Sequence, residues 1–301
     1  MKGSVSVSVP AKINLQLSIG DVRSDGYHDL ATVFHAIDLT DQVVATSADG
    51  LRISVRGEGA KFVPTDASNL ASKAAQSLAD FHGIEPRVHL EIDKRIPVAG
   101  GMAGGSADAA GALIACDALW DLKTSKKELQ SIAASLGSDV PFALSGGTSI
   151  GLGRGELLTP VLTSGEFHWV IALSDGGLST PKVYAECDRL RALTSPRDYT
   201  PRISDELVAA LRAGDAELLA PQLHNDLQDA AISLKPSLAR VLDTGMELGA
   251  LAGIVSGSGP TCVFLVASRE KELTLAASLS GSGVCRTVRT AHGPVAGAHQ
   301  N

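Results

Sequence analysis

The chain has 301 residues, 44% of them hydrophobic, with a formal charge of −7 and four cysteines. This length predicts two domains of roughly 150 residues each, and an acidic chain without a basic tract is disfavoured as a general nucleic-acid binder. No apolar run approaches the ~20 residues of a membrane span, and the widely separated cysteines predict reduced thiols of a cytoplasmic protein rather than a disulfide or zinc framework.

The first part of the chain mixes strand and helix patterns. Strict alternation of apolar residues up to Val9 predicts a half-buried strand, and the apolar residues from Ile13 to Ile19 also alternate as in a strand. A helix is predicted over about 69–82, with Asn69 as its N-cap and Gly83 as the glycine that ends it. The predicted strands are 4–9, 12–19, 30–38, 51–56 and 88–92.

A glycine-rich stretch over 97–107 follows these strands and opens a helix predicted over about 105–119. Glycine lets successive backbone N–H groups turn inward, and a helix N-terminus adds partial positive charge, so the stretch predicts a phosphate site. It matches neither G-x-x-x-x-G-K-[ST], since Ser106 and Ala107 follow Gly105, nor G-x-G-x-x-G. The alternative is a turn that only packs closely.

The next helix has clear boundaries. Ser125 and Glu128 form a capping-box pattern, and Gly137 is placed to end the helix. A short helix is predicted directly after Ser138 and Asp139, with Pro141 in its first turn.

Glycines around 146–155 predict the boundary to a second domain. The tail over 292–301 is rich in small and polar residues and is predicted to fray. The helices predicted in this half are 181–194, 204–213, 222–231, 235–249 and 269–280, and the predicted strands are 168–174, 254–256, 261–267 and 284–290.

Three separated segments resemble the GHMP small-molecule kinases. They are P-A-K-I-N-L at 10–15, the glycine stretch at 97–107 and S-G-S-G-P-T at 256–261. The family's phosphate loop has the form P-x-G-G-G-L-G-G-G-S-S-N, and the small alanines of this chain preserve room for a phosphate. The departures from that form are Ala99, Met102, Ala103, Ala107 and Asp108.

The resemblance implies a two-domain α+β fold. The N-terminal ATP-binding α/β domain is expected over 1–155, and the C-terminal substrate-binding domain, a ferredoxin-like α+β domain, is expected over 156–301. The cleft between the two domains is expected to hold both substrates.

Further segments resemble one branch of the family, whose acceptor is 4-diphosphocytidyl-2-C-methyl-D-erythritol. They are R-S-D-G-Y-H at 23–28, I-D-K-R-I-P at 92–97, L-G-S-D-V-P-F at 136–142 and T-P-K-V-Y at 180–184. The expected reaction moves the γ-phosphoryl group of ATP to the 2-hydroxyl of this acceptor, in the non-mevalonate route to isoprenoid precursors.

The catalytic residues implied by the resemblance are Lys12 and Asp139. An ammonium at Lys12 would polarise the acceptor hydroxyl and the transferring phosphoryl group, and Asp139 would accept the hydroxyl proton or orient it. The alternatives are a surface lysine on an alternating strand and a carboxylate that only caps a helix.

The resemblance also implies how ATP and Mg2+ bind. Asn69 and Lys94 match positions that border the adenine pocket, and the Ser106 hydroxyl is expected near the phosphates and Mg2+. The alternatives are that Asn69 only caps a helix, that Lys94 is a solvated lysine and that Ser106 is an N-cap. The loop residues expected to bind ATP are Pro97, Val98, Ala99, Gly100, Gly101, Met102, Ala103, Gly104, Gly105, Ser106 and Ala107.

For the acceptor, the resemblance implies that Tyr27 and Tyr184 stack on the cytosine, that His28 bonds to its edge and that Asn14 contacts the substrate. Ordinary packing is the alternative for Tyr27 and His28. The expected partner is a small molecule, with neither nucleic acid nor membrane, for a monomer or weak homodimer. The alternative functions are a kinase for mevalonate, homoserine or a sugar, a catalytically silent nucleotide sensor and, more distantly, a dehydrogenase.

Overall fold

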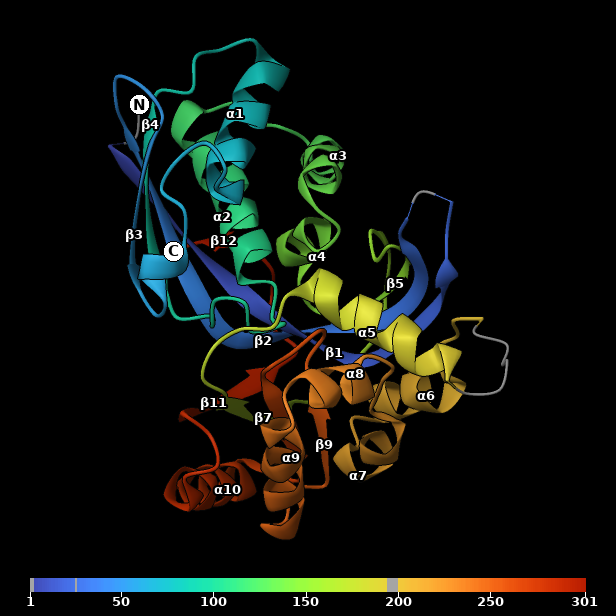
Figure 1. Cartoon of the computed structure of the whole chain (residues 1–301). Helices are drawn as coiled ribbons and strands as arrows, with labels where there is room; N and C mark the ends of the chain where they lie inside the picture. The colour runs from blue at the N-terminus through green and yellow to red at the C-terminus, as the bar shows by residue number, and fades with distance from the viewer. Residues whose placement is uncertain (1–2, 25, 194–199) are drawn as a thin grey trace.

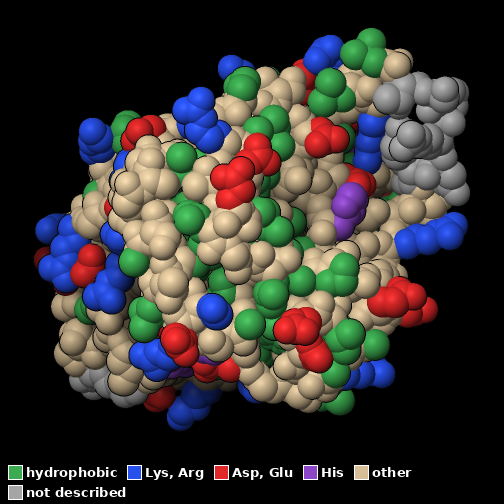
Figure 2. All heavy atoms as spheres, turned by 90° about the horizontal axis from the view of Figure 1, so that it is seen from below, with side chains coloured by type: hydrophobic (Ala, Val, Ile, Leu, Met, Phe, Trp, Pro, Cys, Tyr) green, Lys and Arg blue, Asp and Glu red, His purple; other side chains and the backbone are tan. Residues whose placement is uncertain are grey.

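The computed structural model describes residues 3–24, 26–193 and 200–301, and these residues form a mixed α+β structure with two sheets. Figure 1 shows a larger lobe, with α1 to α4 on one side of its sheet, above a second lobe that carries β7, β9 and β11. On the face seen in Figure 2, acidic and basic side chains are interspersed. None of the described helices is long and apolar enough to cross a membrane.

The larger sheet has eight strands, five of them in the order β12-β1-β2-β4-β3. Of the other three, β5 pairs with β2, β6 pairs with β5, and β8 pairs with β1. The strands predicted at 4–9 and 12–19 form one long strand, β1. The register of β1 against β2 shifts between Pro10 and Ala11, which is where a proline is tolerated in a sheet. The strands are β1 Ser4–Val22, β2 His28–Ser47, β3 Arg52–Gly57, β4 Val88–Lys94, β5 Thr148–Gly153, β6 Leu157–Pro160, β8 His224–Asn225 and β12 His299–Gln300.

Four helices cover one face of this sheet, and their ends follow the local signals. The Asn69 side chain accepts from the Ala71 N–H, Gly83 has a φ of 65°, and the Ser125 capping box is formed, as predicted. Gly111 lets α2 lie close to the sheet, because a Cβ there would be 2.7 Å from the Val43 Cγ2 atom. The elements are η1 Ala60–Phe62, α1 Leu70–His82, α2 Gly104–Trp120, α3 Lys126–Leu136 and α4 Val140–Ser145.

The second sheet is antiparallel, with the order β11-β7-β10-β9. Helices between β7 and β9 and between β10 and β11 give the β-α-β-β-α-β plan of the ferredoxin-like fold, as expected. Its strands are β7 Phe167–Leu173, β9 Ala252–Val255, β10 Cys262–Val266 and β11 Thr287–Gly293. The helices are α5 Thr180–Ala192, α6 Asp205–Ala213, α7 Ala216–Leu219, η2 Ala220–Gln222, α8 Gln228–Leu234, α9 Ser237–Glu247 and α10 Arg269–Ser282.

Two predictions for the second half were wrong. The helix predicted over 222–231 begins only at Gln228, because Asn225 pairs in β8 and its amide donates to the carbonyls of Val255 and Gly257. The tail predicted to fray is ordered: β12 pairs β1. Gly297 permits this return, since a Cβ there would overlap the Leu144 carbonyl. Both segments are fixed by contacts far away in sequence.

The domain boundary at 155/156 stays a prediction. Three strands from beyond that point, β6, β8 and β12, join the larger sheet, so the chain passes between the two lobes more than once. The site described below therefore rests on segments that are fixed to both lobes.

His35 provides a test of how the two sheets pack. Its ring contacts those of Phe167 and Trp169, with centroids 6.0 and 5.8 Å apart, and burial lowers its pKa to about 3. Below about pH 6.5 the unfolded chain binds a proton here that the folded chain excludes, so stability falls as the pH falls towards 3. The unfolding free energy of the wild type should therefore fall between about pH 7 and about pH 5. We expect this fall to be about 2 kcal/mol smaller in His35→Gln, as measured by urea titration at each pH. An identical loss in the variant would contradict this.

Candidate active site

A cavity of about 920 Å³ is lined by residues of both lobes. Residues of β1 and β2 line one part of the cavity, and the glycine stretch with the start of α2 lines another. The second lobe contributes residues of α5 together with Gly257 and Ser258. A cavity of this size that joins two lobes is a typical place for a small-molecule site.

Lys12 and Asp139 face each other in this cavity. Lys12 is only 7% exposed, which excludes a surface lysine, and its Nζ lies 3.7 Å from an Asp139 carboxylate oxygen. Asp139 occupies the N-cap position of α4, yet its side chain makes no capping hydrogen bond. The carboxylate therefore does not serve as a cap and is directed to the neighbourhood of the ammonium.

Asn14 fixes the direction of the Lys12 side chain. Its Oδ1 accepts from Lys12 Nζ at 2.7 Å, while its Nδ2 donates to the Thr32 hydroxyl at 2.7 Å. The Thr32 hydroxyl in turn donates to the Gln16 carbonyl. Asn14 is 2% exposed, so this chain of hydrogen bonds holds the ammonium at a fixed point beside the cavity.

The glycine stretch passes through three residues of positive φ directly into α2. Ala99, Gly101 and Ala103 have φ values of 53°, 79° and 58°, and α2 begins directly afterwards at Gly104. The backbone therefore winds tightly into a helix N-terminus, which favours negative charge. Ser106 lies in the first turn of α2 and lines the cavity, whereas the N-cap is Ala103.

A second glycine turn from the other lobe packs against this loop. The Ser256 hydroxyl donates to the Gly101 carbonyl at 3.2 Å, and Gly257 and Gly259 have φ values of 53° and 73°. The loop that is predicted to hold phosphate is thus held in place from both lobes.

Gly101→Ala should disrupt this contact. A Cβ at Gly101 would overlap the Ser256 carbonyl oxygen, and the φ of 79° is strained for alanine. We expect a loss of about 1–3 kcal/mol in unfolding free energy together with a nucleotide affinity at least roughly ten-fold weaker. Thermal melts and MgADP titrations measure both, and Gly281→Ala, where a Cβ meets nothing within 4 Å, is the control. Unchanged nucleotide affinity in Gly101→Ala would contradict the role of this close approach.

Lys94 is buried rather than solvated, with 2% exposure, and it pairs with Asp41 and Asp108. Burial raises the pKa of Asp108 to about 8, although the Lys94 ammonium opposes this. Burial alone would lower the pKa of Lys94, and the two carboxylates together raise it instead. Sequence reasoning missed Asp41, because β2 also carries Asp29 and Asp38 and the local pattern does not distinguish the buried carboxylate from these.

Tyr27, His28 and Tyr184 line the same cavity. The His28 and Tyr184 rings lie 5.1 Å apart, and the Arg154 guanidinium lies 4.9 Å from the centre of the Tyr27 ring. Burial raises the pKa of the Tyr184 hydroxyl. Asp25, part of the motif that identified Tyr27, lies outside the described residues.

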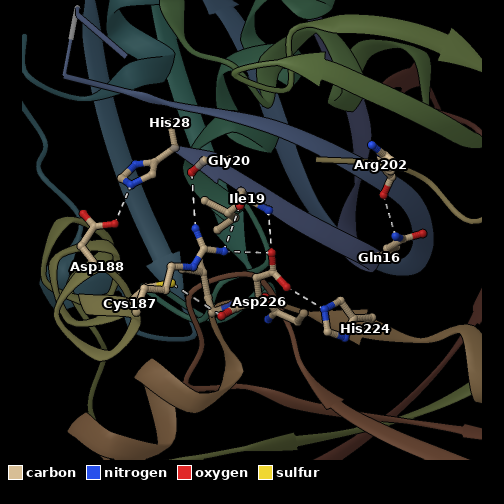
Figure 3. A network of polar contacts seen from close by, with 12 residues as sticks. Gln16, Ile19, Gly20, His28, Cys187, Asp188, Arg202, His224 and Asp226 are labelled. Carbon is tan, nitrogen blue, oxygen red and sulfur yellow. Dashed lines mark hydrogen bonds and ion pairs between the residues drawn. The ribbon is translucent and has the colours of Figure 1, made fainter. Parts of the chain in front are cut away.

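Figure 3 shows a carboxylate that the sequence reasoning missed. Asp188 lies one helical turn after Tyr184 on α5, and one of its oxygens is 2.9 Å from His28 Nε2. The i, i+4 spacing from Tyr184 is the sequence signal that could have found it. Asp188 therefore fixes the orientation of the His28 ring at the cavity wall.

A polar network attaches α5 to β1. Arg191 donates to the Ile19 carbonyl at 2.9 Å and lies 3.1 Å from an Asp226 oxygen. Asp226 also accepts from the Ile19 N–H, a contact that Figure 3 shows. His224 pairs with the other Asp226 oxygen at 2.6 Å. This network holds the helix that carries Tyr184 against the strand that carries Lys12.

Among the described residues, no group of three or more His, Cys, Asp or Glu side chains could hold a metal ion. The described cysteines are all free thiols, as expected.

The comparisons with known proteins identify the family. Residues 69–147 match the model of the GHMP kinases N-terminal domain, and residues 207–285 match that of the GHMP kinases C-terminal region. The 4-diphosphocytidyl-2-C-methyl-D-erythritol kinase of Mycolicibacterium smegmatis is 57% identical over 300 residues, which cover 99% of this chain and 92% of that protein. The chain belongs to the GHMP kinases. It is a small-molecule kinase, as its motifs indicated.

Two further relatives place this GHMP kinase within the family. The Rhodococcus jostii protein of the same name is 57% identical over 296 residues, which cover 98% of this chain and 94% of that one. A crystal structure of 4-(cytidine 5'-diphospho)-2C-methyl-D-erythritol kinase, 30% identical, superposes with a TM-score of 0.77 over 95% of this chain and 98% of its own. The expected two-domain architecture is thereby confirmed.

Proposed function

We propose that this GHMP kinase transfers the γ-phosphoryl group of ATP to the 2-hydroxyl of 4-diphosphocytidyl-2-C-methyl-D-erythritol, in the non-mevalonate route to isoprenoid precursors. The observation that carries the proposal is that one cavity is lined by the phosphate-type loop, by Lys12 with Asp139, and by Tyr27, His28 and Tyr184. Relatives that are 57% identical over almost the whole chain carry the name of this activity.

The geometry supports a direct transfer. The acceptor oxygen attacks the γ-phosphorus, the bond from that phosphorus to the ADP oxygen breaks, and the hydroxyl proton passes to Asp139. Lys12, held by Asn14, stabilises the negative charge on the phosphoryl oxygens during transfer. Because phosphoryl transfer has a loose transition state, positioning by these two side chains contributes more than a strong base would.

The proposed nucleotide site is the loop Pro97–Ala107 together with Asn69 and Lys94, all but Met102 and Ala107 of which line the cavity. Met102 and Ala107 are buried beneath it. The Ser106 hydroxyl, at the N-terminal turn of α2, fits a site in which the ATP phosphates supply most of the Mg2+ ligands. When bound, Mg2+ would neutralise charge on those phosphates.

The proposed acceptor site is formed by Asn14, Tyr27, His28 and Tyr184. An aromatic ring on a base face with hydrogen bonds to the base edge is a common way to hold an unstacked base. The other GHMP acceptors considered, mevalonate, homoserine and sugars, have no base for these rings to stack on.

Tyr184→Ala is expected to raise the KM for the acceptor by roughly 5- to 150-fold while leaving the KM for ATP within about two-fold, because one stacked base contributes about 1–3 kcal/mol. Tyr184→Phe, which keeps the ring, is the matched control and should retain the acceptor KM. Initial rates with each substrate varied in turn measure the two constants. Equal changes in both KM values would show that the ring does not serve the acceptor.

The proposal is tested by ADP release from MgATP with and without the acceptor. We expect release that depends on 4-diphosphocytidyl-2-C-methyl-D-erythritol, together with a thermal shift by CDP. Release only with mevalonate, homoserine or a sugar would overturn the acceptor and keep the kinase. ATP binding with no release for any acceptor would favour a nucleotide sensor.

We also propose a cytoplasmic location and a monomer or weak homodimer. The free thiols are compatible with a reducing compartment. Sedimentation over a range of protein concentrations would test the oligomeric state, and a stable larger assembly would contradict it.

A further inference from the structure

A buried ion cluster lies directly behind the phosphate loop. Asp41 on β2 is 0% exposed, and its Oδ1 accepts from the backbone N–H groups of Arg95 and Ile96 at 2.5 and 2.8 Å. Its other oxygen accepts from the Lys94 ammonium. These contacts fix the backbone where the chain leaves β4 and enters the loop.

The Lys94 ammonium reaches the other end of the loop. It donates to Asp108 Oδ2 at 2.7 Å and to the Gly104 carbonyl at 3.2 Å, in addition to Asp41. An ammonium has three N–H donors, so all three are used inside the protein. Lys94 lines the cavity, but it has no donor left for a direct bond to a nucleotide.

The cluster therefore holds both ends of the segment from Arg95 to Gly104. This segment includes Gly100 and Gly101, and glycine loses more conformational entropy on ordering than any other residue. A loop that is already fixed at both ends avoids much of that loss when the nucleotide binds, which raises affinity without any new contact.

We propose that Asp41, acting through Lys94 and the backbone of Arg95 and Ile96, is a positioning residue that preforms the phosphate loop for the nucleotide. This inference rests on the proposed nucleotide site and assigns Lys94 an indirect part in it. Neither Asp41 nor Lys94 contacts the reacting atoms in this scheme. Asp108 and Gly104 are the points on α2 through which the cluster holds the loop.

The test is Asp41→Asn, which keeps the side-chain shape and an oxygen for the two N–H groups but removes one of the two carboxylates that pair with Lys94. We expect a KM for ATP and a Kd for MgADP at least roughly ten-fold higher, since the buried ammonium then keeps only Asp108 as a charged partner and loses its ionic link to β2. The KM for the acceptor should stay within about two-fold. The control is Leu90→Ala on β4, a buried apolar truncation that should cost about 2–5 kcal/mol of stability without touching the loop.

Two outcomes would overturn the proposal. One is wild-type nucleotide affinity in folded Asp41→Asn, and the other is a change in both KM values that Leu90→Ala reproduces at equal loss of stability. MgADP titration requires no turnover. It therefore tests the role of Asp41 separately from the proposed function, which is contradicted if ADP release does not depend on the acceptor.

A measurement on the wild-type protein remains decisive if Asp41→Asn does not fold. Amide hydrogen exchange of Arg95 and Ile96 should be slow without nucleotide, because their N–H groups are bonded to Asp41. The amides of Gly100 and Gly101 should become slow only when MgADP is added. Fast exchange at Arg95 and Ile96 in the nucleotide-free protein would show that the loop is not preformed.

Discussion

Asp139→Asn is expected to lower kcat for acceptor phosphorylation by roughly 10²- to 10⁴-fold, the usual contribution of a positioned proton acceptor. The asparagine keeps the shape of the side chain but cannot take the hydroxyl proton. Because the Asp139 side chain makes no capping bond to α4, the change removes no helix cap. We therefore expect the melting temperature to stay close to that of the wild type and the KM for ATP to change little.

The measurement is steady-state ADP release at saturating substrates, with circular dichroism melts of the same samples. Asp93→Asn is a matched control, since Asp93 forms an exposed ion pair with Arg56 away from the cavity. Wild-type kcat in Asp139→Asn would remove Asp139 from the mechanism. A fall in kcat matched by a large fall in stability would indicate a structural role instead.

Local signals predicted much of the fold. The N-cap at Asn69, the capping box at Ser125 and the glycine at Gly83 each depend on residues within one helical turn, so the sequence contains the whole interaction. The alternation of β1 reflects one buried face only from Ser4 to Val9, since the strand is buried on both faces from Val9 to Leu17. The family motifs also predicted that Lys12 and Asp139 share one site, and the two charged groups lie 3.7 Å apart.

What could not be predicted depends on contacts between distant segments. Asn225 forms β8 because carbonyls at Val255 and Gly257 accept its amide, which no local pattern announces. A solvated strand end, the alternative for Lys94, is wrong, because Asp41, 53 positions away, and Asp108 both pair with its ammonium in the interior. Asp188 similarly meets His28 across 160 positions.

Lys12→Met is expected to lower kcat by roughly 10²- to 10³-fold, because a fixed ammonium would no longer stabilise the transferring phosphoryl group. Methionine fills a similar volume beside the Phe34 ring, which lies 5.3 Å from Lys12 Nζ. The variant should fold with a modest loss of stability, about 1–3 kcal/mol, since Asn14 Oδ1 loses its donor. A kcat equal to that of the wild type would exclude an electrostatic role for Lys12.

The double variant Lys12→Met/Asp139→Asn distinguishes a working pair from two independent groups. The two charged groups are 3.7 Å apart, and residues that act as a unit in catalysis have strongly non-additive effects. We therefore expect kcat of the double variant to lie within about ten-fold of kcat of the less active single variant. Independent residues would instead lower kcat by the product of the two single-variant factors. Fully multiplicative losses would mean that each residue contributes separately. Non-additivity would instead show that Lys12 serves the reaction by fixing both the phosphoryl charge and the carboxylate that receives the proton.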